Sequence, residues 1–450
     1  MMFSLAEELR GLCRQLKPLI GPSADSLWTH YQLAENLAAR AEAESMIRMM
    51  AVSYLGAQVD DRAVRLPPSD TLDTGGDIFL GDIRYPGRLS QPLYLHSRDL
   101  VKHTGIFATT GSGKTHVAYN LLQQFVKNKI PFLVIDWKRS YRNLKSLPGM
   151  QDLDVFTVGR DASPFLWNPL RPPPNVHPQT WIQILADVLE KTHVSGQGVA
   201  DVLAELADME FEAKGFYADP GAASEYPNFF DLKNQLDRRK YSGRKALWRD
   251  SCLRILRTFV FGPASKAFNA RHPVHLEDLL DKPVILELDL ELPKTVRTFF
   301  TETILRWIHL YRLSQGETDR LRHVLVLEEA HNIFPAPTYG TTSNGGLENV
   351  YREIRSFGQA LVAITQHPSM LPIYVLGNTH TLIFMALTHE ADIISARQAL
   401  FLERNQDAFL DRLGVGEGIV KIKGRLPPTH VQFQEIHVQP GAIKDEDLKS

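Results

Sequence analysis

The chain has 450 residues, and its 50 Lys and Arg against 52 Asp and Glu give a formal net charge of −2. This balance excludes a protein that coats nucleic acid with its whole surface, so any nucleic-acid contact has to come from local clusters of positive charge. The two cysteines exclude a disulfide scaffold and a cysteine-rich zinc site, and no apolar stretch reaches the roughly 20 residues of a membrane helix. We therefore expect a soluble, cytoplasmic protein without membrane contact.

Residues 1–56 form a predicted helical region. Its first helix carries an apolar stripe with spacings of three and four residues, formed by Leu5, Leu9, Leu12, Leu16 and Leu19. The stretch 18–22 contains two prolines and a glycine and breaks this helix, and a second helix is expected from about Asp25 to Tyr54. The stripes indicate either packing within the chain or an interface with a subunit or partner. Residues 57–100 have prolines and glycines between short apolar pieces, which predicts short strands and turns.

From about residue 101 the pattern alternates between strands and helices. Apolar runs without polar interruption predict strands buried on both faces, at 105–107, 131–136, 283–290, 323–329, 360–366 and 381–387. Helices are predicted at 115–128 and 295–313. This order is typical of an α/β fold with a mainly parallel sheet, which we assign to residues 101–435. A mostly helical insertion at about 175–262 follows a proline-rich linker, and residues 436–450 are expected to form a polar tail.

The strongest motif is A-T-T-G-S-G-K-T at residues 108–115, between a predicted strand and a predicted helix. In this context the backbone N–H groups at the start of the helix converge on phosphate groups. Gly111 and Gly113 allow backbone angles that are closed to other residues. We expect Lys114 to reach the β- and γ-phosphates and Thr115 to hold Mg²⁺, so the cofactors are ATP and Mg²⁺. The predicted nucleotide-binding residues are Thr110, Gly111, Ser112, Gly113, Lys114, Thr115 and His116.

An acidic pair ends the apolar strand at 323–329, at the sheet edge where parallel sheets bind ligands. We expect Glu328 to support Mg²⁺, directly or through water, and Glu329 to orient and polarise the attacking water. The next strand ends at Gln366, whose amide is expected either to sense the γ-phosphate and place the water or to cap the strand. His367, which follows it, is interpreted as a structural or contact residue.

Two basic residues, Arg352 and Arg355, precede that strand, and their spacing places them on one face of a helix. Spacing alone favours an exposed helix face, and a cation that completes a neighbouring subunit's site is the alternative. Asp136 and Lys138 follow another core strand, where they are expected to support the site or to contact a polymer substrate.

Together these segments resemble the HerA/FtsK superfamily of P-loop motor ATPases, most closely its HerA-like branch. The resemblance covers roughly residues 78–435 and is carried by LVKHTGIFATTGSGKT, PFLVIDWKRSY, FLWNPLRPP, VLVLEEAHNIFP, REIRSFGQALVAITQHPSMLP and LGVGEGIVKIKGRLPPTHV. It implies a RecA-like core and a ring, usually of six subunits, with ATP between subunits and double-stranded DNA in the centre. Arg355 is similar to the family's trans-acting arginine finger, with Arg352 as the alternative, and Gly416–Gly418 resembles a turn near the end of the core.

The sequence departs from the family pattern in two ways. HerA-like motors commonly carry an N-terminal β-barrel that docks a nuclease, whereas only a short strand-like segment, 57–100, precedes the phosphate loop here. We expect this segment to be a reduced barrel or none, which leaves the docking of a nuclease open. Ala108 replaces the usual first glycine of the loop and Glu328 stands where Asp is usual, so ATP binding is expected while the rate of hydrolysis is left open.

Clusters of basic residues are candidates for DNA contact, which would be independent of DNA sequence and sensitive to salt. The densest is the run RRKYSGRKALWR at 238–249, for which a solvated helix face is the alternative. In a ring each cluster repeats around the pore, so a modest charge per subunit suffices. The candidates are Arg238, Arg239 and Lys240 in this run, Lys138, Arg139 and Arg142 in a second cluster, and Lys421, Lys423 and Arg425 in a third.

The leading hypothesis for function is an ATP-driven, helicase-like DNA translocase of the HerA type. It would work as a homo-oligomeric ring, a hexamer by family expectation, on double-stranded DNA and with a nuclease or another effector. The alternative is an ATP-gated ring scaffold that assembles and activates a partner effector, for example in anti-phage defence, without moving DNA. A substrate pump tied to a secretion channel is a third interpretation, against which the missing membrane segment counts.

Overall fold

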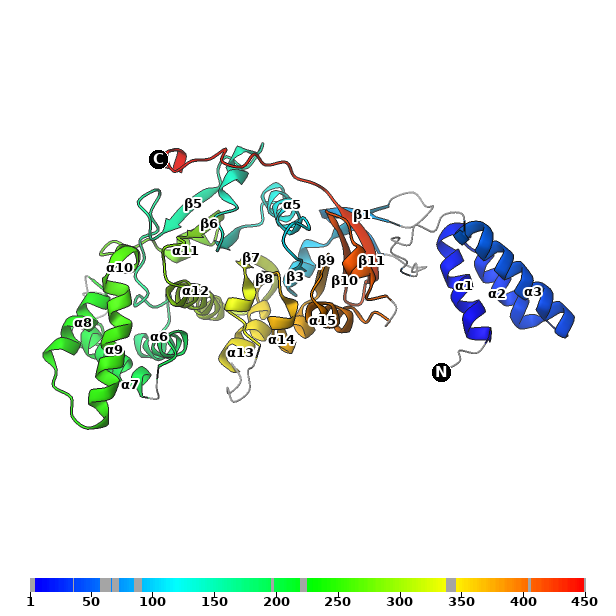
Figure 1. Ribbon diagram of the computed structural model, residues 1–450. Helices are drawn as coiled ribbons and strands as arrows, with labels where there is room; N and C mark the ends of the chain where they lie inside the picture. Colours follow the sequence, from blue (N-terminus) through cyan, green and yellow to red (C-terminus); the bar gives the residue numbers. More distant parts are fainter. Residues whose placement is uncertain are drawn as a thin grey trace.

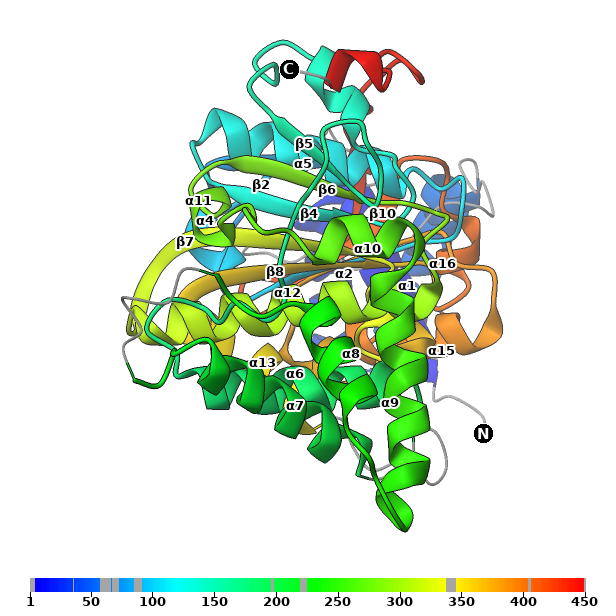
Figure 2. The ribbon, with the colours of Figure 1, turned by 90° about the vertical axis from the view of Figure 1, so that its left-hand side faces the viewer.

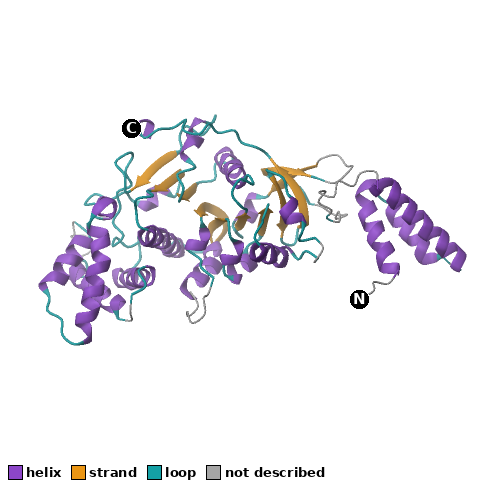
Figure 3. Ribbon diagram, viewed as in Figure 1, coloured by secondary structure: helices purple, strands orange, loops and turns teal. Residues whose placement is uncertain are grey.

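The structure of the chain is a computed structural model that describes residues 5–34, 36–56, 66, 73–84, 91–195, 198–218, 225–336, 345–403 and 406–448. Within these residues a sheet of eleven strands runs through the molecule in the order β2-β1-β11-β10-β9-β3-β8-β7-β4-β6-β5 (Figure 1). The strands occupy the centre, and helices lie on both faces of the sheet (Figure 3).

The strands from β9 to β5 in this order run parallel to their neighbours. Their side chains are buried on both faces, and in β4, for example, Leu133 and Val134 belong to the apolar cores on opposite faces. This confirms the predicted α/β fold with a mainly parallel sheet, although the sequence analysis did not identify β5. These strands are β9 (Thr381–Met385), β3 (Thr104–Phe107), β8 (Phe357–Thr365), β7 (Thr318–Glu328), β4 (Phe132–Asp136), β6 (Pro283–Leu288) and β5 (Asp154–Val158).

On the other side of β9 the sheet continues with antiparallel strands. They are, in order from β9, β10 (Glu417–Ile422), β11 (Leu426–Phe433), β1 (Ile78–Ile83) and β2 (Gln91–Leu95). Gly81 of β1 pairs with Phe433 of β11, so the strands that precede the phosphate loop close against the last strand of the chain. The short strands predicted in 57–100 therefore extend the central sheet.

Helices on the two faces fix the ends of the central strands. On one face lies α5 (Lys114–Lys127), and on the other lie α12 (Lys294–Ser314), α13 (Gly345–Glu353), α14 (Ile373–Asn378) and α15 (Glu390–Leu400) (Figure 1). Leu121 and Leu122 of α5 pack in the same core as Ile106 of β3 and Val362 of β8, which anchors the helix that starts at the phosphate loop. Short helices α4 (Ser97–Leu100), α11 (Leu276–Leu279) and α16 (Phe409–Arg412) form parts of the connections.

A helical subdomain follows β5 in the chain and packs below the sheet (Figure 2). It contains α6 (Pro178–Thr192), α7 (Val199–Ala213), α8 (Phe229–Arg238), α9 (Arg244–Val260) and α10 (Gly262–Phe268). Its core is continuous with α12, because the ring of Phe259 lies 4.5 Å from that of Phe229 and 4.8 Å from that of Phe299, centroid to centroid. The region expected as an insertion at about 175–262 is helical, and the helices continue to Phe268.

The N-terminal region is a helical bundle of α1 (Leu5–Ile20), α2 (Ser23–Leu33) and α3 (Leu37–Met50), followed by a π-helical turn at Ala51–Gly56. Leu9 and Leu16 of the predicted apolar stripe are buried inside it, whereas Leu5 is exposed. Among the described residues, its apolar cores contain no side chain from beyond Gly56. The bundle lies apart from the sheet in Figure 1.

The structure departs from two expectations about the ends of the chain. A single helix from Asp25 to Tyr54 was predicted, but Asn36 accepts a hydrogen bond from the amide of Ala39 and starts a new helix. The stretch 436–450 was expected to be a polar tail. Its described part runs across the sheet from β11 to the β5 end, and Leu448 is buried (Figure 1).

None of the helices in the described ranges combines the length and the apolar character that crossing a membrane requires.

Candidate nucleotide-binding site

The phosphate loop connects β3 to α5, at the edge of the sheet where the parallel strands end. Gly111 and Gly113 have φ angles of 84° and 97°, in the left-handed region that the sequence analysis predicted for them. A Cβ atom at Gly113 would lie 3.1 Å from the backbone nitrogen of Gly416, so the chain after α16 also restricts this position. Gly416 donates a hydrogen bond to the carbonyl of Ser112 at 2.9 Å and supports the loop from the β10 side.

Ala108, the departure at the first loop position, is fully buried and its amide donates to the carbonyl of Thr365 at 3.3 Å. Its φ lies outside the left-handed region, which alanine would occupy only under strain. The loop therefore accommodates alanine at this position without a backbone penalty.

A cavity of about 310 Å³ opens at the loop. Its lining brings together residues of four predicted segments, namely Thr110, Gly111, Gly113, Lys114, Thr115, His116, Lys138, Glu328 and Gln366. The imidazole of His116 contacts the carbonyl of Ile436 at 2.9 Å, and its amide donates to the carbonyl of Gly113. His116 therefore links the loop to the C-terminal segment.

Lys114 begins α5 and is buried, and its ammonium nitrogen has no hydrogen-bond partner among the described residues. Burial lowers the pKa of Lys114, and the nearby charge of Glu329 acts in the opposite direction. A buried cation without a partner is costly unless an anion joins it. The site is therefore prepared for a phosphate group at Lys114.

Glu329 lies at the centre of a hydrogen-bonded chain. Thr110 Oγ1 donates to Gln366 Oε1 at 2.6 Å, and Gln366 Nε2 donates to Glu329 Oε1 at 2.9 Å. The ammonium group of Lys138 forms an ion pair with the same carboxylate oxygen. Burial alone would raise the pKa of Glu329, but the hydrogen bonds from Lys138 and Gln366 outweigh it and lower this pKa, so the group is ionised.

The backbone of Glu329 is in the left-handed region, with a φ of 51°, directly after β7. This conformation is uncommon for a residue with a side chain and is concentrated at functional sites. It turns the Glu329 carboxylate toward Gln366, at the end of the neighbouring strand β8. Lys138 was predicted as a support of the site or a DNA contact, and the ion pair places it in the site.

Glu328 and Asp136 form a second, buried acidic pair, because β7 and β4 are neighbours and end at the same level. Asp136 accepts hydrogen bonds from the amides of Lys138 (2.9 Å) and Tyr141 (3.0 Å), whereas Glu328 Oε2 has no partner in the part of the chain that the structure describes. Burial, together with the charge of Asp136, raises the pKa of Glu328. The buried Glu328 Oε2, which has no donor, fits a magnesium ion, which Glu328 and Thr115 would hold together with the remaining lone pairs of Asp136.

The histidines at this edge have structural contacts. His367 Nδ1 lies 3.1 Å from Asp392 Oδ2, so His367 joins α15 to the strand end. His331, which the sequence analysis did not single out, lies 2.8 Å from Thr365 Oγ1 and 3.4 Å from Glu329 Oε2. No local sequence pattern marks His331, because its position depends on the turn after Glu329.

Arg352 and Arg355 lie at the opposite edge of the sheet from the phosphate loop. Arg352 ends α13 and pairs with Glu348 at 2.5 Å, whereas Arg355 lies on an exposed 3-10 turn just before β8. Strand β8 spans 9 residues, so at ~3.3 Å per residue about 30 Å separates Arg355 from Gln366. Neither arginine can reach the nucleotide site of its own chain.

The predicted basic clusters differ in whether their side chains are exposed and whether they form ion pairs with carboxylates. Arg142, predicted as a DNA contact, has a buried guanidinium that is paired with Glu287 and Asp445. In the helical subdomain Arg239 pairs with Glu205. The exposed residues Arg238, Lys240 and Arg244 have no ion-pair partner within the described ranges. In the third cluster Lys421 lies over the ring of Phe401, and Arg425 is tied to Asp73 and to backbone carbonyls.

Comparison with known proteins supports the fold that holds these residues. Residues 79–212 match the family model described as the central domain of helicase HerA. The structure of VirB4 of Thermoanaerobacter pseudethanolicus superposes with a TM-score of 0.63 and 18% identity, covering 82% of this chain and 98% of that one. The plasmid coupling protein TrwB is similar in complex with ADP and Mg²⁺ (TM-score 0.57, 13% identity, 80% of this chain, 91% of that one). TrwB with a non-hydrolysable ATP analogue gives a TM-score of 0.57 at 14% identity, with the same coverage.

Among curated protein sequences none matches this chain. The chain has the α/β fold of the P-loop ATPases VirB4 and TrwB, with a phosphate loop at the start of α5. The match to the HerA central domain covers residues 79–212, and the likeness to VirB4 and TrwB shows the fold of the chain.

Proposed function

We propose that the chain is an ATP-hydrolysing DNA translocase of the HerA type that works as a homo-oligomeric ring, a hexamer by family expectation. The observation that carries the proposal is that the proposed catalytic groups lie at opposite ends of the parallel strands, some at the carboxyl ends and Arg355 at the amino end of β8. The phosphate loop, Glu329 and Gln366 lie at one edge, and the exposed Arg355 lies at the other. An arginine finger at Arg355 can act only in trans, which requires a neighbour oriented head to tail, as in a ring.

Hydrolysis follows from the contacts at the loop. Lys114 binds the β- and γ-phosphates, whose charge supplies the partner that its buried ammonium group lacks. A magnesium ion held by Thr115, Glu328 and Asp136 would neutralise charge on the phosphates. Glu329, kept ionised, orients a water molecule toward the γ-phosphate and accepts its proton.

The ion pair between Lys138 and Glu329 supports a role for Lys138 in gating this step. While it pairs with Lys138, the carboxylate of Glu329 is a weaker base and one of its oxygens is occupied. A γ-phosphate in the cavity offers Lys138 a competing anion, because Lys138 lines the same cavity as the loop. Nucleotide binding would thus release Glu329 for water activation.

DNA contact is assigned to the tip of the helical subdomain. Arg238, Lys240 and Arg244 are exposed there, and within the described ranges none of them forms an ion pair with a carboxylate. Such charges bind DNA phosphates without reading sequence, and in a ring the set is repeated by every subunit. Arg239 is the internal contrast, since it is paired with Glu205.

A nuclease or another effector is the proposed partner, and the N-terminal bundle α1–α3 is the element that supports this part. Its apolar cores are independent of the sheet within the described residues, and Met46, Met49 and Leu33 are exposed on its surface. The same bundle favours the alternative, in which the ATP-bound ring activates an effector without moving DNA. Exposed apolar side chains on a small helical unit suit protein contacts more than DNA contacts.

The proposal is tested by the ATPase rate with and without linear double-stranded DNA, at low and high salt. Wild type should be stimulated by DNA, and stimulation should fall as salt rises. Glu329→Gln should bind ATP and DNA without turnover, and Lys114→Ala should lose ATP binding. The triple variant Arg238→Ala, Lys240→Ala and Arg244→Ala should lose the stimulation, and Lys266→Ala, which removes an exposed lysine paired with Asp161, is the matched control.

Absence of DNA stimulation in wild type, combined with full effector activation by the Glu329→Gln ring, would refute translocation and favour the scaffold. Undiminished ATP affinity in Lys114→Ala would refute the assignment of the loop.

A further inference from the structure

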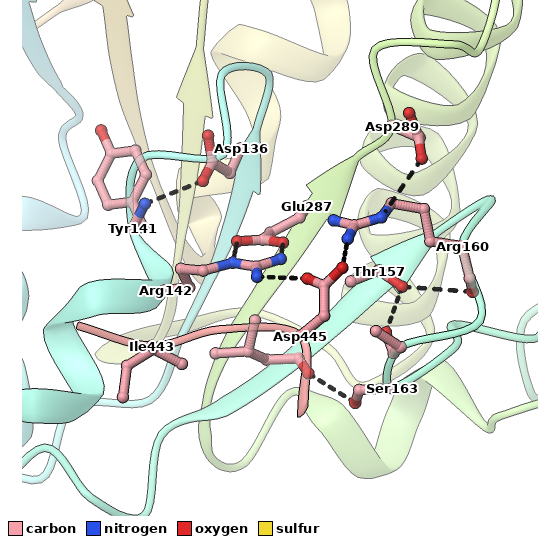
Figure 4. A network of polar contacts seen from close by, with 12 residues as sticks. Asp136, Tyr141, Arg142, Thr157, Arg160, Ser163, Glu287, Asp289, Ile443 and Asp445 are labelled. Atoms are coloured by element: carbon pink, nitrogen blue, oxygen red, sulfur yellow. Dashed lines mark hydrogen bonds and ion pairs between the residues drawn. The ribbon is translucent and has the colours of Figure 1, made fainter. Parts of the chain in front are cut away.

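A network of buried ion pairs joins the ends of β4, β6 and β5 to the C-terminal segment (Figure 4). Arg142 binds Glu287 of β6 through Nε (2.6 Å) and Nη2, and its Nη1 donates to Asp445 Oδ1 at 2.6 Å. Arg160 donates through Nη2 to Asp445 Oδ2, and its Nε lies 3.6 Å from Asp289 Oδ2. Figure 4 shows the Asp445 carboxylate between the two guanidinium groups.

Asp445 is the member of this network that can leave. The Glu287 side chain is 1% exposed and comes from the interior of a strand, whereas Asp445 is 36% exposed. Asp445 lies 303 residues from Arg142 and 285 from Arg160 in sequence, on a segment without a long helix or a strand of its own in the described chain. Beyond the ion pairs, the segment is held here by the amide of Ile443, which donates to Asn143 Oδ1 at 3.0 Å, and by the buried Leu448.

The Asp445 carboxylate does not provide an acceptor for every hydrogen-bond donor of the arginines around it. Arg160 Nη1 and Arg139 Nε are buried and have no acceptor among the described residues. Burial and the charges of Arg139 and Arg142 lower the pKa of Arg160, so the positive charges lie close enough to repel one another. A second carboxylate of the same planar shape would leave the same donors without acceptors. A phosphate group is tetrahedral and presents oxygens in more directions, which suits a site with several converging arginines.

A nucleotide on the phosphate loop cannot supply this phosphate. The loop follows β3, and the sheet order places β4, β6 and β5 three to five strands away, roughly 15–25 Å at the usual strand spacing. The phosphate has to come from another molecule at the same sheet edge.

We propose that Arg142 and Arg160 form a second phosphate site, for a backbone phosphate of a polynucleotide, and that Asp445 fills this site in the DNA-free chain. The proposal rests on the proposed DNA-binding function. A polynucleotide is favoured over free phosphate because Asp445 competes from within the same chain, at high effective concentration. A polymer that is held by other contacts on the same chain would also present its phosphates at high effective concentration, whereas a free ion would not.

This arrangement accounts for Arg142, which belongs to a predicted DNA-contact cluster and yet is buried. Its Nη1 is the atom that Asp445 covers, and departure of the segment would expose it beside Arg160. Residues 443–447 would then act as an acidic substitute for DNA that the polymer displaces.

The first test measures binding of a fluorescent duplex by anisotropy, with the full chain. Asp445→Ala and Asp445→Asn should tighten binding about 3- to 10-fold, because the internal competitor is removed. Glu446→Ala is the matched control, since it removes the same charge from an exposed position of the same turn and should change affinity little. Arg160→Gln should lower the slope of log affinity against log salt by about one and cancel the gain from Asp445→Ala.

Equal tightening by Glu446→Ala would show a general charge effect, and a gain that survives Arg160→Gln would place the phosphate elsewhere. Either result overturns the proposal. If wild type shows DNA-stimulated ATP hydrolysis and Asp445→Ala binds DNA as wild type does, this inference fails while the proposed function stands. If neither protein binds DNA, the proposed function fails first.

The second test needs no substitution. Hydrogen exchange of peptides that cover 436–448 should become faster when duplex DNA is added to wild type, because the Ile443 amide loses its partner. Sodium phosphate at equal phosphate concentration and polyglutamate of matched charge are the comparison probes. Unchanged exchange with DNA, or equal acceleration by either probe, would overturn the assignment to a polynucleotide.

Discussion

Replacing Arg355 with Ala is expected to abolish ATP turnover while nucleotide binding is retained. The exposed guanidinium precedes β8, about 30 Å of extended strand away from Gln366, so it cannot act on the site of its own chain. Loss of an arginine supplied in trans lowers turnover by roughly 10³–10⁵-fold, or about 4–7 kcal/mol of barrier. Arg352→Ala is the matched control, because Arg352 already pairs with Glu348 and should keep most of the activity.

Mixing subunits tests the trans geometry directly. Arg355→Ala subunits keep Glu329, and Glu329→Gln subunits keep Arg355, so each variant alone has no complete site. In rings mixed at random in equal amounts, about a quarter of the sites combine an intact Glu329 with an intact neighbouring Arg355 and should recover that share of wild-type turnover. Steady-state phosphate release measures the recovery. Mixed rings no more active than the single variants, with ring assembly intact, would refute the reasoning.

The remaining predictions concern the loop, the base and the core. Ala108→Gly should leave ATP affinity within about twofold and lower thermal stability slightly, by about 0.5–1 kcal/mol, because Ala108 already has an ordinary φ; a large gain in affinity would contradict this. Lys138→Met should raise the pKa of Glu329 in the nucleotide-free enzyme, so the acid limb of kcat/KM against pH should move to higher pH, with Lys266→Met unchanged; an unmoved limb would exclude the ion pair as its cause. Burial lowers the pKa of His103 to about 4. As pH falls from 6.5 to 4, the unfolded chain therefore binds a proton that the folded chain does not. The free energy of unfolding should fall by up to about 3 kcal/mol over this range. Thermal unfolding of His103→Asn, which tolerates the φ of 69° and does not titrate, should depend less on pH over this range, and an identical pH dependence would refute the role of His103.

The parallel half of the sheet could be predicted because its strands are apolar on both faces. Strand β5, with the sequence DVFTV, contains two polar residues among five and lacks the same signal. The β10–β11 hairpin carries Lys421, Lys423 and Arg425 around its turn, and in the sequence they indicate a basic cluster, although β11 is paired with β1 on its other edge. That pairing joins Gly81 to Phe433, and no local pattern can indicate a contact of such sequence separation.

The site residues could be placed at strand ends, but their partners depend on strand order. Because β7 lies between β4 and β8, Glu329 has Lys138 on one side and Gln366 on the other. Arg142 illustrates the opposite case. A run of basic residues indicates an exposed cluster, and only the position of Glu287 inside β6 shows that Arg142 is buried. Likewise the left-handed turn at Glu329 follows from the packing of the strand ends and not from its sequence.

Strand β8 also has a mechanical consequence for a ring. It is hydrogen-bonded to β3 on one side and to β7 on the other, so it cannot stretch or slide separately from the sheet. One end carries Arg355, which under the proposed function would enter the neighbour's site, and the other is followed by Gln366, which donates a hydrogen bond to the Glu329 carboxylate. In each subunit, strand β8 would then be a rigid connection between two consecutive nucleotide sites. In such a ring, ATP hydrolysis at one site would influence hydrolysis at the next site, so hydrolysis would proceed in order around the ring.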